Sequence, residues 1–243
     1  MRDQAILDHI VEASGVGPED VVLEIGPGEG FLTRTLAKKC KKVLALEIDR
    51  SLAEKLKSDL PPNVELRQGD ALELNEQQIQ ESLGESWHLV SNLPYEITSR
   101  TLQKFLSGSP KPLSITLLIQ KEVAERIVGR GGMSRLAVFC GYHALPKVLF
   151  AVPPGAFSPP PKVDSAVIRL EVRQDSLLDP VSEERLFKLS AAAFAEKRKT
   201  LANSLKSVLG KNSSEIIEKS GLNPMARPEE ISLEQWIHLA RTV

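Results

Sequence analysis

A glycine-rich turn directly after a short apolar run is the feature that most constrains the fold. The run Val21–Ile25 is rich in β-branched residues and stops at the turn Gly26-Pro27-Gly28-Glu29-Gly30. Residues 31–39, which follow, have helical spacing. A strand, a tight glycine turn and a helix in this order are typical of the start of a doubly wound α/β sheet.

Four further apolar runs of strand length follow and alternate with helical segments. They span Val43–Leu46, Val64–Arg67, Trp87–Ser91 and Ile115–Ile119. Strands that alternate with helices predict a mostly parallel sheet with helices on both faces. Ligands of such sheets bind outside the carboxyl ends of the strands. The expected fold class is therefore α/β, and the residues that end each strand are the first candidates for a site.

The pattern changes in the second half of the chain. Val148–Val152 predicts another strand, and the proline cluster Pro153–Pro161 predicts a rigid extended loop. Val163–Val172 alternates apolar and polar residues, as an antiparallel edge strand does. Beyond it the spacing is helical. We expect two domains, residues 1–173 with the sheet and residues 174–243 as a small helical domain.

Composition is that of an ordinary globular chain of 243 residues, 42% of them apolar, with a formal net charge of −1. The two cysteines, Cys40 and Cys140, have no partner at metal or redox spacing, and the four histidines are scattered. We expect a reducing, cytoplasmic location, no metal site, no membrane span and a monomer. The balanced charge argues against a general nucleic-acid coat protein but allows a local basic surface.

The spacing of the glycines indicates which class of nucleotide or nucleoside ligand such a turn binds. A dinucleotide fingerprint requires glycine three positions after Gly28, where this chain has Phe31, so a dehydrogenase is disfavoured. A phosphate-binding loop requires Gly-Lys-Ser/Thr, which is absent here. The form Glu24-x-Gly26-x-Gly28-x-Gly30 suits S-adenosylmethionine, which has no phosphate but needs the backbone close to its methionine part.

Acidic residues end the second and third predicted strands. Glu47 follows the glycine turn by about twenty residues, where a carboxylate can accept both ribose hydroxyls. Asp70 can accept from the amine of the cofactor adenine. Either acid alone is more often a solvated loop residue. The ordered set of glycine turn, Glu47, Asp70 and Asn92 at four successive strand ends predicts a methyltransferase sheet.

The tetrapeptide Asn92-Leu93-Pro94-Tyr95 ends the fourth strand. Adenine N6 is a poor nucleophile until acceptors take its N–H donors and turn the lone pair out of the ring plane. The Asn92 side-chain carbonyl and a backbone carbonyl beside Pro94 can be those acceptors. Tyr95 can stack on the base, a contact worth roughly 1–3 kcal/mol. The alternative is a strand-to-helix turn with a buried tyrosine.

With these segments the chain resembles the KsgA family of small-subunit ribosomal RNA adenine N6,N6-dimethyltransferases, which are relatives of the Erm methyltransferases. The matching segments are LEIGPGEGFLT, ALEIDR, GDAL, SNLPYEI, LIQKEVAERI, FSPPPKVDSAVIRL and EKRKTLANSL. They cover about Asp3 to Leu205. The leucine after Asn92 and the last two segments are more similar to KsgA than to Erm.

The resemblance implies a Rossmann-like methyltransferase sheet that binds S-adenosylmethionine, followed by a small helical domain that positions RNA. The residues that it assigns to the cofactor are Glu24, Gly26, Gly28, Glu47, Ile48, Asp70, Ala71 and Asn92. Those that it assigns to catalysis are Asn92, Leu93, Pro94, Tyr95 and Phe157. The flipped base would lie between Tyr95 and Phe157. The alternative for Phe157 is that it holds the proline loop on the core.

The resemblance also implies the substrate, which is two adjacent adenines in a hairpin near the 3′ end of small-subunit ribosomal RNA. Each adenine is methylated twice, in a pre-30S-type particle and with a role in ribosome biogenesis. The cations expected to contact RNA are Arg126, Arg130, Arg135, Lys197, Arg198 and Lys199, the last three at the start of a helical stretch. The alternative for such a charge run is a solvated helix face.

Two departures from the family pattern affect these expectations. Members carry a Gln-Asn-Phe-Leu segment before Asp-Gln, whereas this sequence begins Met1-Arg2-Asp3-Gln4. We expect either a trimmed chain or a more open cofactor pocket. The segment after Ile127 is short and glycine-rich, which predicts a different target-site loop. Alternative functions are an Erm-like enzyme acting on large-subunit RNA, a DNA adenine methyltransferase, and a ribosome-assembly or transcription factor without catalysis.

Overall fold

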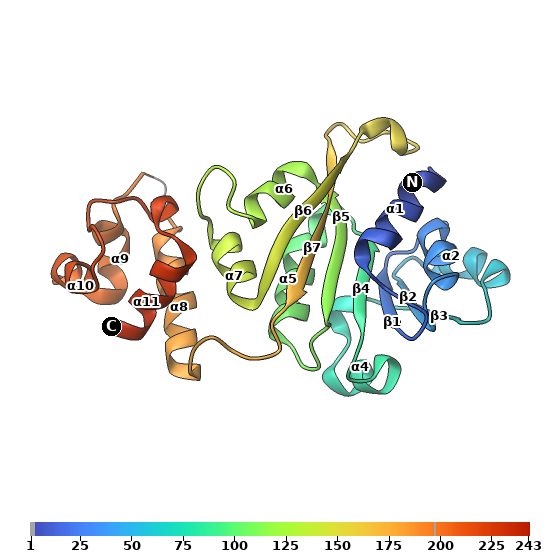
Figure 1. The fold of residues 1–243 in the computed structure, drawn as a ribbon, viewed down its shortest axis with the longest axis horizontal. Coiled ribbons are helices and arrows are strands. Elements are labelled where there is room, and N and C mark those ends of the chain that lie inside the picture. Colours follow the sequence, from blue (N-terminus) through green and yellow to red (C-terminus); the bar gives the residue numbers. More distant parts are fainter. Residues whose placement is uncertain (1–2, 197) are drawn as a thin grey trace. The chain divides into compact units, whose positions relative to one another are not determined.

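The computed structural model describes residues 3–196 and 198–243. It contains a seven-stranded sheet with the strand order β3-β2-β1-β4-β5-β7-β6 (Figure 1). The strands are β1 (Val21–Ile25), β2 (Lys42–Glu47), β3 (Val64–Gln68), β4 (His88–Asn92), β5 (Ser114–Gln120), β6 (Ala144–Val152) and β7 (Ser165–Val172). Strands β1 to β5 are parallel, and β7 runs antiparallel to both β5 and β6. The predicted α/β class is confirmed.

Helices connect the parallel strands and make up the C-terminal region. They are α1 (Gln4–Ser14), α2 (Phe31–Ala37), α3 (Arg50–Leu56), α4 (Glu76–Leu83), α5 (Thr98–Ser107), α6 (Lys121–Ile127), α7 (Arg135–His143), α8 (Pro180–Ala193), α9 (Leu201–Leu209), α10 (Ser213–Lys219) and α11 (Leu233–Thr242). The short 3₁₀ turns are η1 (Lys57–Asp59), η2 (Ala71–Glu73), η3 (Tyr95–Ile97), η4 (Pro154–Ala156) and η5 (Pro228–Glu230). Helix α4 begins at a capping box formed by Asn75 and Gln78, which satisfies two otherwise unpaired backbone donors.

Both faces of the sheet are covered along the parallel strands β1, β2, β4 and β5, because alternate residues of these strands are equally buried. Val22 and Val43 pack in one cluster with Leu7 of α1 and Leu36 of α2. Their neighbour Leu23, which points to the opposite face, is also fully buried. Parallel strands with two covered faces are apolar throughout, and this is why they were visible in the sequence as continuous apolar runs.

Strand β7 is an interior strand, so the prediction of an edge strand at Val163–Val172 was wrong. Its residues pair with β5 on one side and with β6 on the other. The alternation in its sequence predicted the antiparallel direction correctly, but β6 covers the side that was expected to be free. The strand begins at Ser165, and Val163 remains exposed in the preceding loop.

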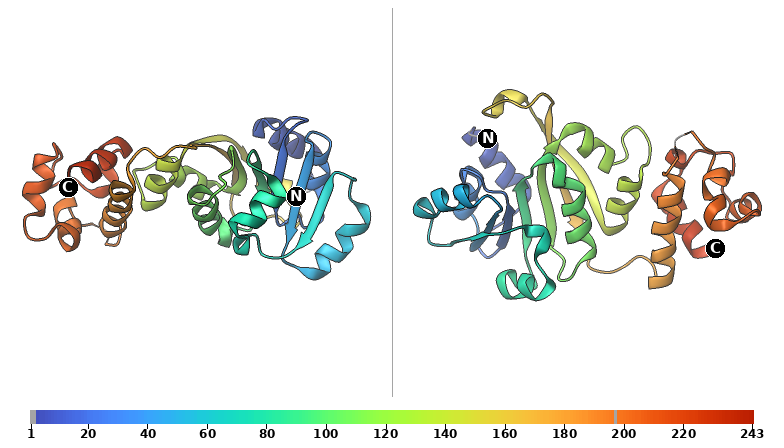
Figure 2. Two further views of the ribbon diagram at one scale, coloured as in Figure 1. Left: turned by 90° about the horizontal axis from the view of Figure 1, so that it is seen from below. Right: turned by 180° about the vertical axis from the view of Figure 1, so that it is seen from behind.

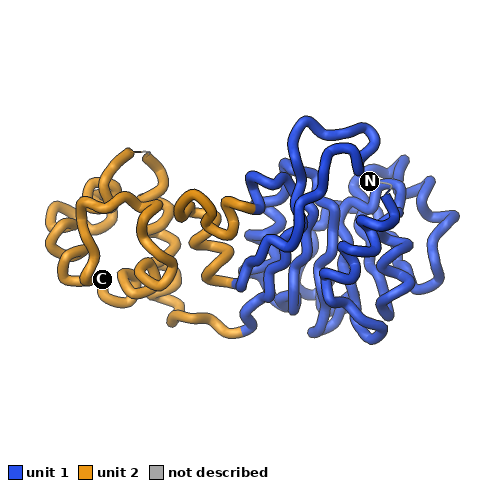
Figure 3. Tube along the Cα trace, turned by 45° about the horizontal axis from the view of Figure 1, so that its top comes forward, with its two compact units in different colours: residues 1–124, 144–174 blue, residues 125–143, 175–243 orange. Residues whose placement is uncertain are grey.

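The chain divides into two compact units (Figure 3). The first comprises residues 1–124 and 144–174, and the second comprises residues 125–143 and 175–243. The pattern of elements in the sequence predicts residues 125–143 in the first domain. They belong to the second unit because Val138 and Tyr142 of α7 share a buried cluster with Leu186 and Trp236 of the C-terminal helices. The order of predicted helices and strands along the chain does not indicate which unit a helix packs in.

Candidate functional site

The glycine turn after β1 has an open side. Gly26 and Gly28 have φ angles of 66° and 57°, in the left-handed region that costs other residues about 1–2 kcal/mol. The Gly28 N–H donates to Glu47 Oε2 at 3.0 Å. A Cβ built on Gly28 would have no heavy atom outside its chain neighbours within 4 Å. The turn therefore presents bare backbone to open space, as a cradle for a ligand requires.

Glu47, at the end of β2, is held by backbone donors on both carboxylate oxygens. Its Oε1 accepts from the Asp49 N–H at 3.0 Å, while Oε2 accepts from Gly28. Each oxygen retains a further lone pair that can accept a hydrogen bond from a hydroxyl group. The next side chain, Ile48, is 65% exposed and offers an apolar surface beside this carboxylate.

Glu24 lies in β1 below the turn and has a buried oxygen without a partner. Its Oε2 makes no hydrogen bond to any described residue. Burial raises the pKa of Glu24 to about 8, and the nearby Glu47 carboxylate adds to the rise. A cationic ligand in the turn would place a positive charge near this carboxyl and would favour its ionised form.

Asp70 follows β3 and caps the turn η2. Its Oδ1 accepts from the Leu72 N–H at 2.8 Å. The Gly69 N–H donates to the Glu47 carbonyl at 2.9 Å, which fixes the end of β3 next to the end of β2. Ala71, also predicted at the cofactor site, is buried at the start of η2. The second and third strands therefore bring their acids to the same edge of the sheet.

Asn92 to Glu96 line a cavity of about 350 Å³ at the end of β4. Within the described chain, no partner hydrogen-bonds the Asn92 side-chain amide, which leaves it available for a ligand. The Pro94 carbonyl accepts from the Ile97 N–H at 3.2 Å. The Leu93 carbonyl is then the better candidate for a second acceptor beside Asn92.

The glycine turn and the Asn92–Tyr95 segment meet in space. A Cβ built on Gly26 would lie 3.7 Å from Pro94 Cδ. The Ser91 hydroxyl, just before Asn92, donates to the Ile25 carbonyl at 2.5 Å. Ser91 was not predicted as a site residue, since a serine inside an apolar run gives no signal of its partner. These contacts confirm that the two segments form one region.

Phe157 lies in the loop between β6 and β7, half-buried against the cluster that contains Leu7 and Ile10 of α1. Figure 1 and the right view of Figure 2 show this loop near the N-terminal end of α1. The contact is the one expected if Phe157 holds the proline loop on the core. Its link to Tyr95 is indirect, because the Tyr95 hydroxyl lies 3.0 Å from the hydroxyl of Ser165, at the end of the same loop.

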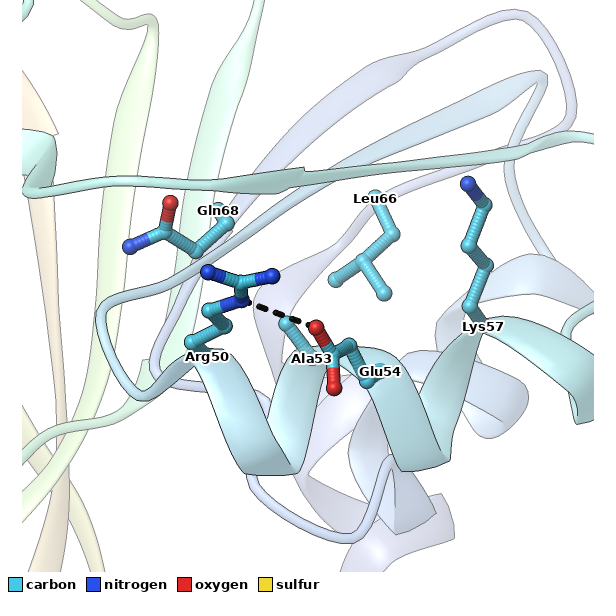
Figure 4. A pocket seen from close by; sticks show the side chains of 6 residues that line it. All are labelled: Arg50, Ala53, Glu54, Lys57, Leu66 and Gln68. Carbon is cyan, nitrogen blue, oxygen red and sulfur yellow. Dashed lines mark hydrogen bonds and ion pairs between the residues drawn. The ribbon is translucent and has the colours of Figure 1, made fainter.

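A separate pocket of about 270 Å³ lies between α3 and the edge strand β3. Residues from the helix and from the strand face each other across it, with Arg50 ion-paired to Glu54 (Figure 4). The full lining is Arg50, Ala53, Glu54, Lys57, Leu66 and Gln68. None of these was predicted as a site residue. Gln68 Nε2 donates to the Ile48 carbonyl at 3.3 Å, so the pocket borders the loop that follows Glu47 at the end of β2.

The cations predicted to contact RNA fall in the second unit. Arg126, Arg130 and Arg135 are exposed in and between α6 and α7, and Arg130 is ion-paired to Glu125 at 3.2 Å. Lys199 and Arg198 are also exposed.

Arg198 and Lys199 do not start a helix, which corrects the prediction for this charge run. Both lie between the end of α8 and the start of α9. Arg198 has a φ of 72°, and this left-handed conformation interrupts helical geometry. Lys197 lies outside the described residues.

The residues around the glycine turn fit S-adenosylmethionine better than a phosphate-bearing cofactor. The Glu47 carboxylate accepts from the Gly28 N–H in the turn, and its negative charge would repel a phosphate. A ligand with a sulfonium and an ammonium group carries the opposite charge. The open backbone at Gly28 gives its methionine part room.

The described part of the chain contains no helix long and apolar enough to cross a membrane. Over residues 3–196 and 198–243 there is also no group of three or more histidine, cysteine, aspartate or glutamate side chains arranged to hold a metal ion.

Comparison with known proteins decides the family. The family model for ribosomal RNA adenine dimethylase matches residues 1–243. The chain belongs to the ribosomal RNA adenine dimethylase family. A relative of this dimethylase, from Caldanaerobacter subterraneus subsp. tengcongensis, is named ribosomal RNA small subunit methyltransferase A. It is 44% identical over 99% of this chain and 93% of its own length. The predicted family is confirmed.

Solved structures confirm the fold of this dimethylase. The 23S rRNA methyltransferase ErmE superposes with a TM-score of 0.78 at 31% identity, covering 100% of this chain and 98% of its own. A dimethyladenosine transferase from Plasmodium falciparum gives 0.80 at 26% identity, covering 98% and 95%. The predicted Rossmann-like methyltransferase sheet is therefore present.

Proposed function

We propose that this chain methylates adenine N6 in small-subunit ribosomal RNA, with S-adenosylmethionine as the methyl donor. The relative that is 44% identical over nearly the whole chain carries the small-subunit name. The observation that carries the proposal is that the glycine turn contacts the Asn92–Tyr95 segment. A Cβ built on Gly26 would lie 3.7 Å from Pro94 Cδ. A donor held by the turn is thereby adjacent to a base held by the segment.

The residues that would hold the cofactor lie at the ends of β1 to β4. Glu47 accepts the ribose hydroxyls, and Ile48 packs on the cofactor adenine with its exposed side chain. Asp70, followed by Ala71, accepts from the amine of that adenine. Glu24 balances the positive charge of the methionine part. Bound S-adenosylmethionine supplies a methyl group that its sulfonium already activates for in-line transfer.

The target adenine leaves the RNA stack and enters the cavity that Asn92 to Glu96 line. The Asn92 amide oxygen and the Leu93 carbonyl accept hydrogen bonds from the two N6–H groups, and Pro94 fixes the backbone between these acceptors and Tyr95. Tyr95 stacks on one face of the base, and Phe157 approaches from the proline loop. The chain therefore contributes mainly alignment and capture of the base.

No strongly basic side chain is needed at this site. Adenine N6 becomes acidic as it gains positive charge during transfer, so it gives up its proton without a tuned base. The same acceptors hold a singly methylated N6 for the second transfer, because one N–H then remains to be bound.

We further propose that the substrate is two adjacent adenines in a hairpin near the 3′ end of the RNA, each methylated twice. The chain would act on a pre-30S-type particle in the cytoplasm during ribosome biogenesis, as a monomer and without a metal. The second unit, residues 125–143 and 175–243, would position the RNA. Its candidate contacts are Arg126, Arg130, Arg135, Arg198 and Lys199, together with Lys197.

The test is transfer of labelled methyl groups from S-adenosylmethionine to small ribosomal subunits isolated from cells that lack the modification. We expect two methyl groups on each of two adenines. Large-subunit RNA and duplex DNA serve as competing substrates. Preferred labelling of large-subunit RNA would contradict the small-subunit assignment and favour an Erm-like activity, which the similarity to ErmE makes worth testing.

Asn92→Ala tests the capture of the base. We expect transfer to fall by about 100-fold or more, because the amide oxygen acts on the reacting nitrogen. Calorimetric binding of S-adenosylmethionine should persist. The matched control is Asn75→Ala, which removes an asparagine that caps α4 and should leave transfer unchanged. Full turnover in Asn92→Ala would contradict the role of this residue.

A further inference from the structure

Two hydroxyl groups join the target-base segment Asn92–Tyr95 to the start of β7. The Tyr95 hydroxyl and the Ser165 hydroxyl lie 3.0 Å apart, although the residues are 70 positions apart in the chain. Either oxygen can be the donor, so the contact holds whichever proton is shared. The motifs that carry the family resemblance assign no role to this contact, and the roles considered above for Tyr95 use only its ring.

Ser165 is a rigid anchor. It is fully buried and is the first residue of β7. Its backbone is in register with Gln120 of β5 on one side and with Val152 of β6 on the other. The residue before it is also fixed, because the Lys121 N–H donates to the Asp164 carbonyl at 3.0 Å. A serine between two paired strands has little freedom to move.

The backbone of Tyr95 is fixed, but the direction of its side chain is not fixed by the backbone contacts. It lies in η3, half-buried, and its carbonyl accepts from the Thr98 N–H at the start of α5. These contacts fix the backbone but leave rotation about χ1, which swings the ring through a wide arc. A hydrogen bond at the far end of the ring fixes the direction of the ring axis. A stacking surface must have that direction set before the base arrives.

We propose that Ser165 is a positioning residue for base capture, which holds the Tyr95 ring in place through its hydroxyl. This inference rests on the proposed function. Because Ser165 also ends the loop that carries Phe157, the same bond sets Tyr95 relative to that loop. The Tyr95 hydroxyl is then used for anchoring, and the substrate meets only the ring.

A double-mutant cycle tests the bond. Ser165→Ala and Tyr95→Phe each remove one hydroxyl and keep the ring, and the double variant removes both. We expect each single variant to lower kcat by about 3- to 10-fold, as loss of one hydrogen bond implies. The double variant should lose no more than either single one, because the two share one interaction. KM for the RNA should change less than about 2-fold, since RNA is held mostly elsewhere.

Tyrosine labelling gives a readout that does not depend on activity. The chain has two tyrosines, so fluorotyrosine gives two ¹⁹F resonances, and the one that disappears in Tyr95→Phe belongs to Tyr95. We expect Ser165→Ala to shift or broaden that resonance and to leave the Tyr142 resonance in place. An unchanged Tyr95 resonance would overturn the proposal.

Ser114→Ala is the matched control. Ser114 is also a buried strand serine with a hydrogen-bonded hydroxyl, 2.8 Å from His88 Nδ1, but it begins β5 at the other end of that strand. We expect it to leave kcat and the Tyr95 resonance unchanged. Equal losses in Ser114→Ala and Ser165→Ala, or additive losses in the cycle, would overturn the positioning role alone. A wild-type chain that transfers no methyl group would overturn the proposed function, and this inference with it.

Discussion

At the scale of single residues, the most informative group is the buried carboxyl of Glu24. Its predicted role rested on its place before the glycine turn, and the structure adds that one oxygen is buried without a partner. Burial raises its pKa from 4.5 to about 8, so the folded chain binds this proton more tightly than the unfolded chain does. The stability linked to it is fully present below pH 4.5 and is lost as the pH rises through about 8.

Glu24→Gln should remove this pH dependence. The amide cannot ionise, so the free energy of unfolding of the variant relative to wild type should increase by at least about 1 kcal/mol between about pH 5 and about pH 8.5. Urea unfolding at these two pH values measures the difference. The control is Glu54→Gln, a replacement of an acid whose side chain is 65% exposed, which should show no comparable trend. Parallel pH profiles for wild type and Glu24→Gln would contradict the assignment of the raised pKa.

At the scale of elements, the connection between α8 and α9 contains a strained position. Arg198 adopts a φ of 72°, in a region where a side chain is disfavoured. Glycine has no such penalty there, so Arg198→Gly should stabilise the fold by about 0.5–1 kcal/mol. Thermal or urea unfolding measures the change.

Arg198→Ala separates the backbone effect from the loss of charge. Alanine keeps the Cβ that causes the strain, so this variant should show no comparable gain in stability. If alanine and glycine stabilise equally, the effect comes from the charge and the strain is absent. RNA affinity is a separate readout for both variants, because both remove the same candidate phosphate contact.

At the scale of the whole molecule, the net charge of −1 means that RNA affinity depends on local cations. Replacing Arg126, Arg130 and Arg135 together by Glu should weaken RNA binding. The slope of log affinity against log salt should fall by about 1 for each RNA phosphate that an arginine no longer neutralises. Arg130 should contribute least, because it is already paired with Glu125.

Titration of RNA at several salt concentrations measures this slope. Lys219→Glu is the control, since it reverses an exposed cation of α10 that is paired with Glu215 in the same unit. If the triple variant keeps the affinity and the slope of wild type, these arginines are a solvated surface and the RNA is held elsewhere.

The sequence alone determined the parallel part of the sheet and the edge at which the candidate site lies. Apolar runs, the turn at Gly26–Gly30 and the strand ends at Glu47, Asp70 and Asn92 are local signals. They suffice because consecutive parallel strands, joined by helices, necessarily bring their carboxyl ends to one edge. The expected adjacency of the glycine turn and the Asn92–Tyr95 segment therefore followed without any knowledge of individual contacts.

Only the tertiary structure decided what depends on residues far apart in the chain. It made β7 an interior strand, assigned residues 125–143 to the second unit and packed the half-buried Phe157 against the cluster that includes Leu7 and Ile10 of α1. It also brought Ser165 to Tyr95. Secondary-structure propensity and residue spacing depend only on residues near a position in the chain. Which distant elements pack together depends on side-chain contacts, which these local signals do not identify. The contact across 70 positions of the chain exists only because two antiparallel strands hold Ser165 in place.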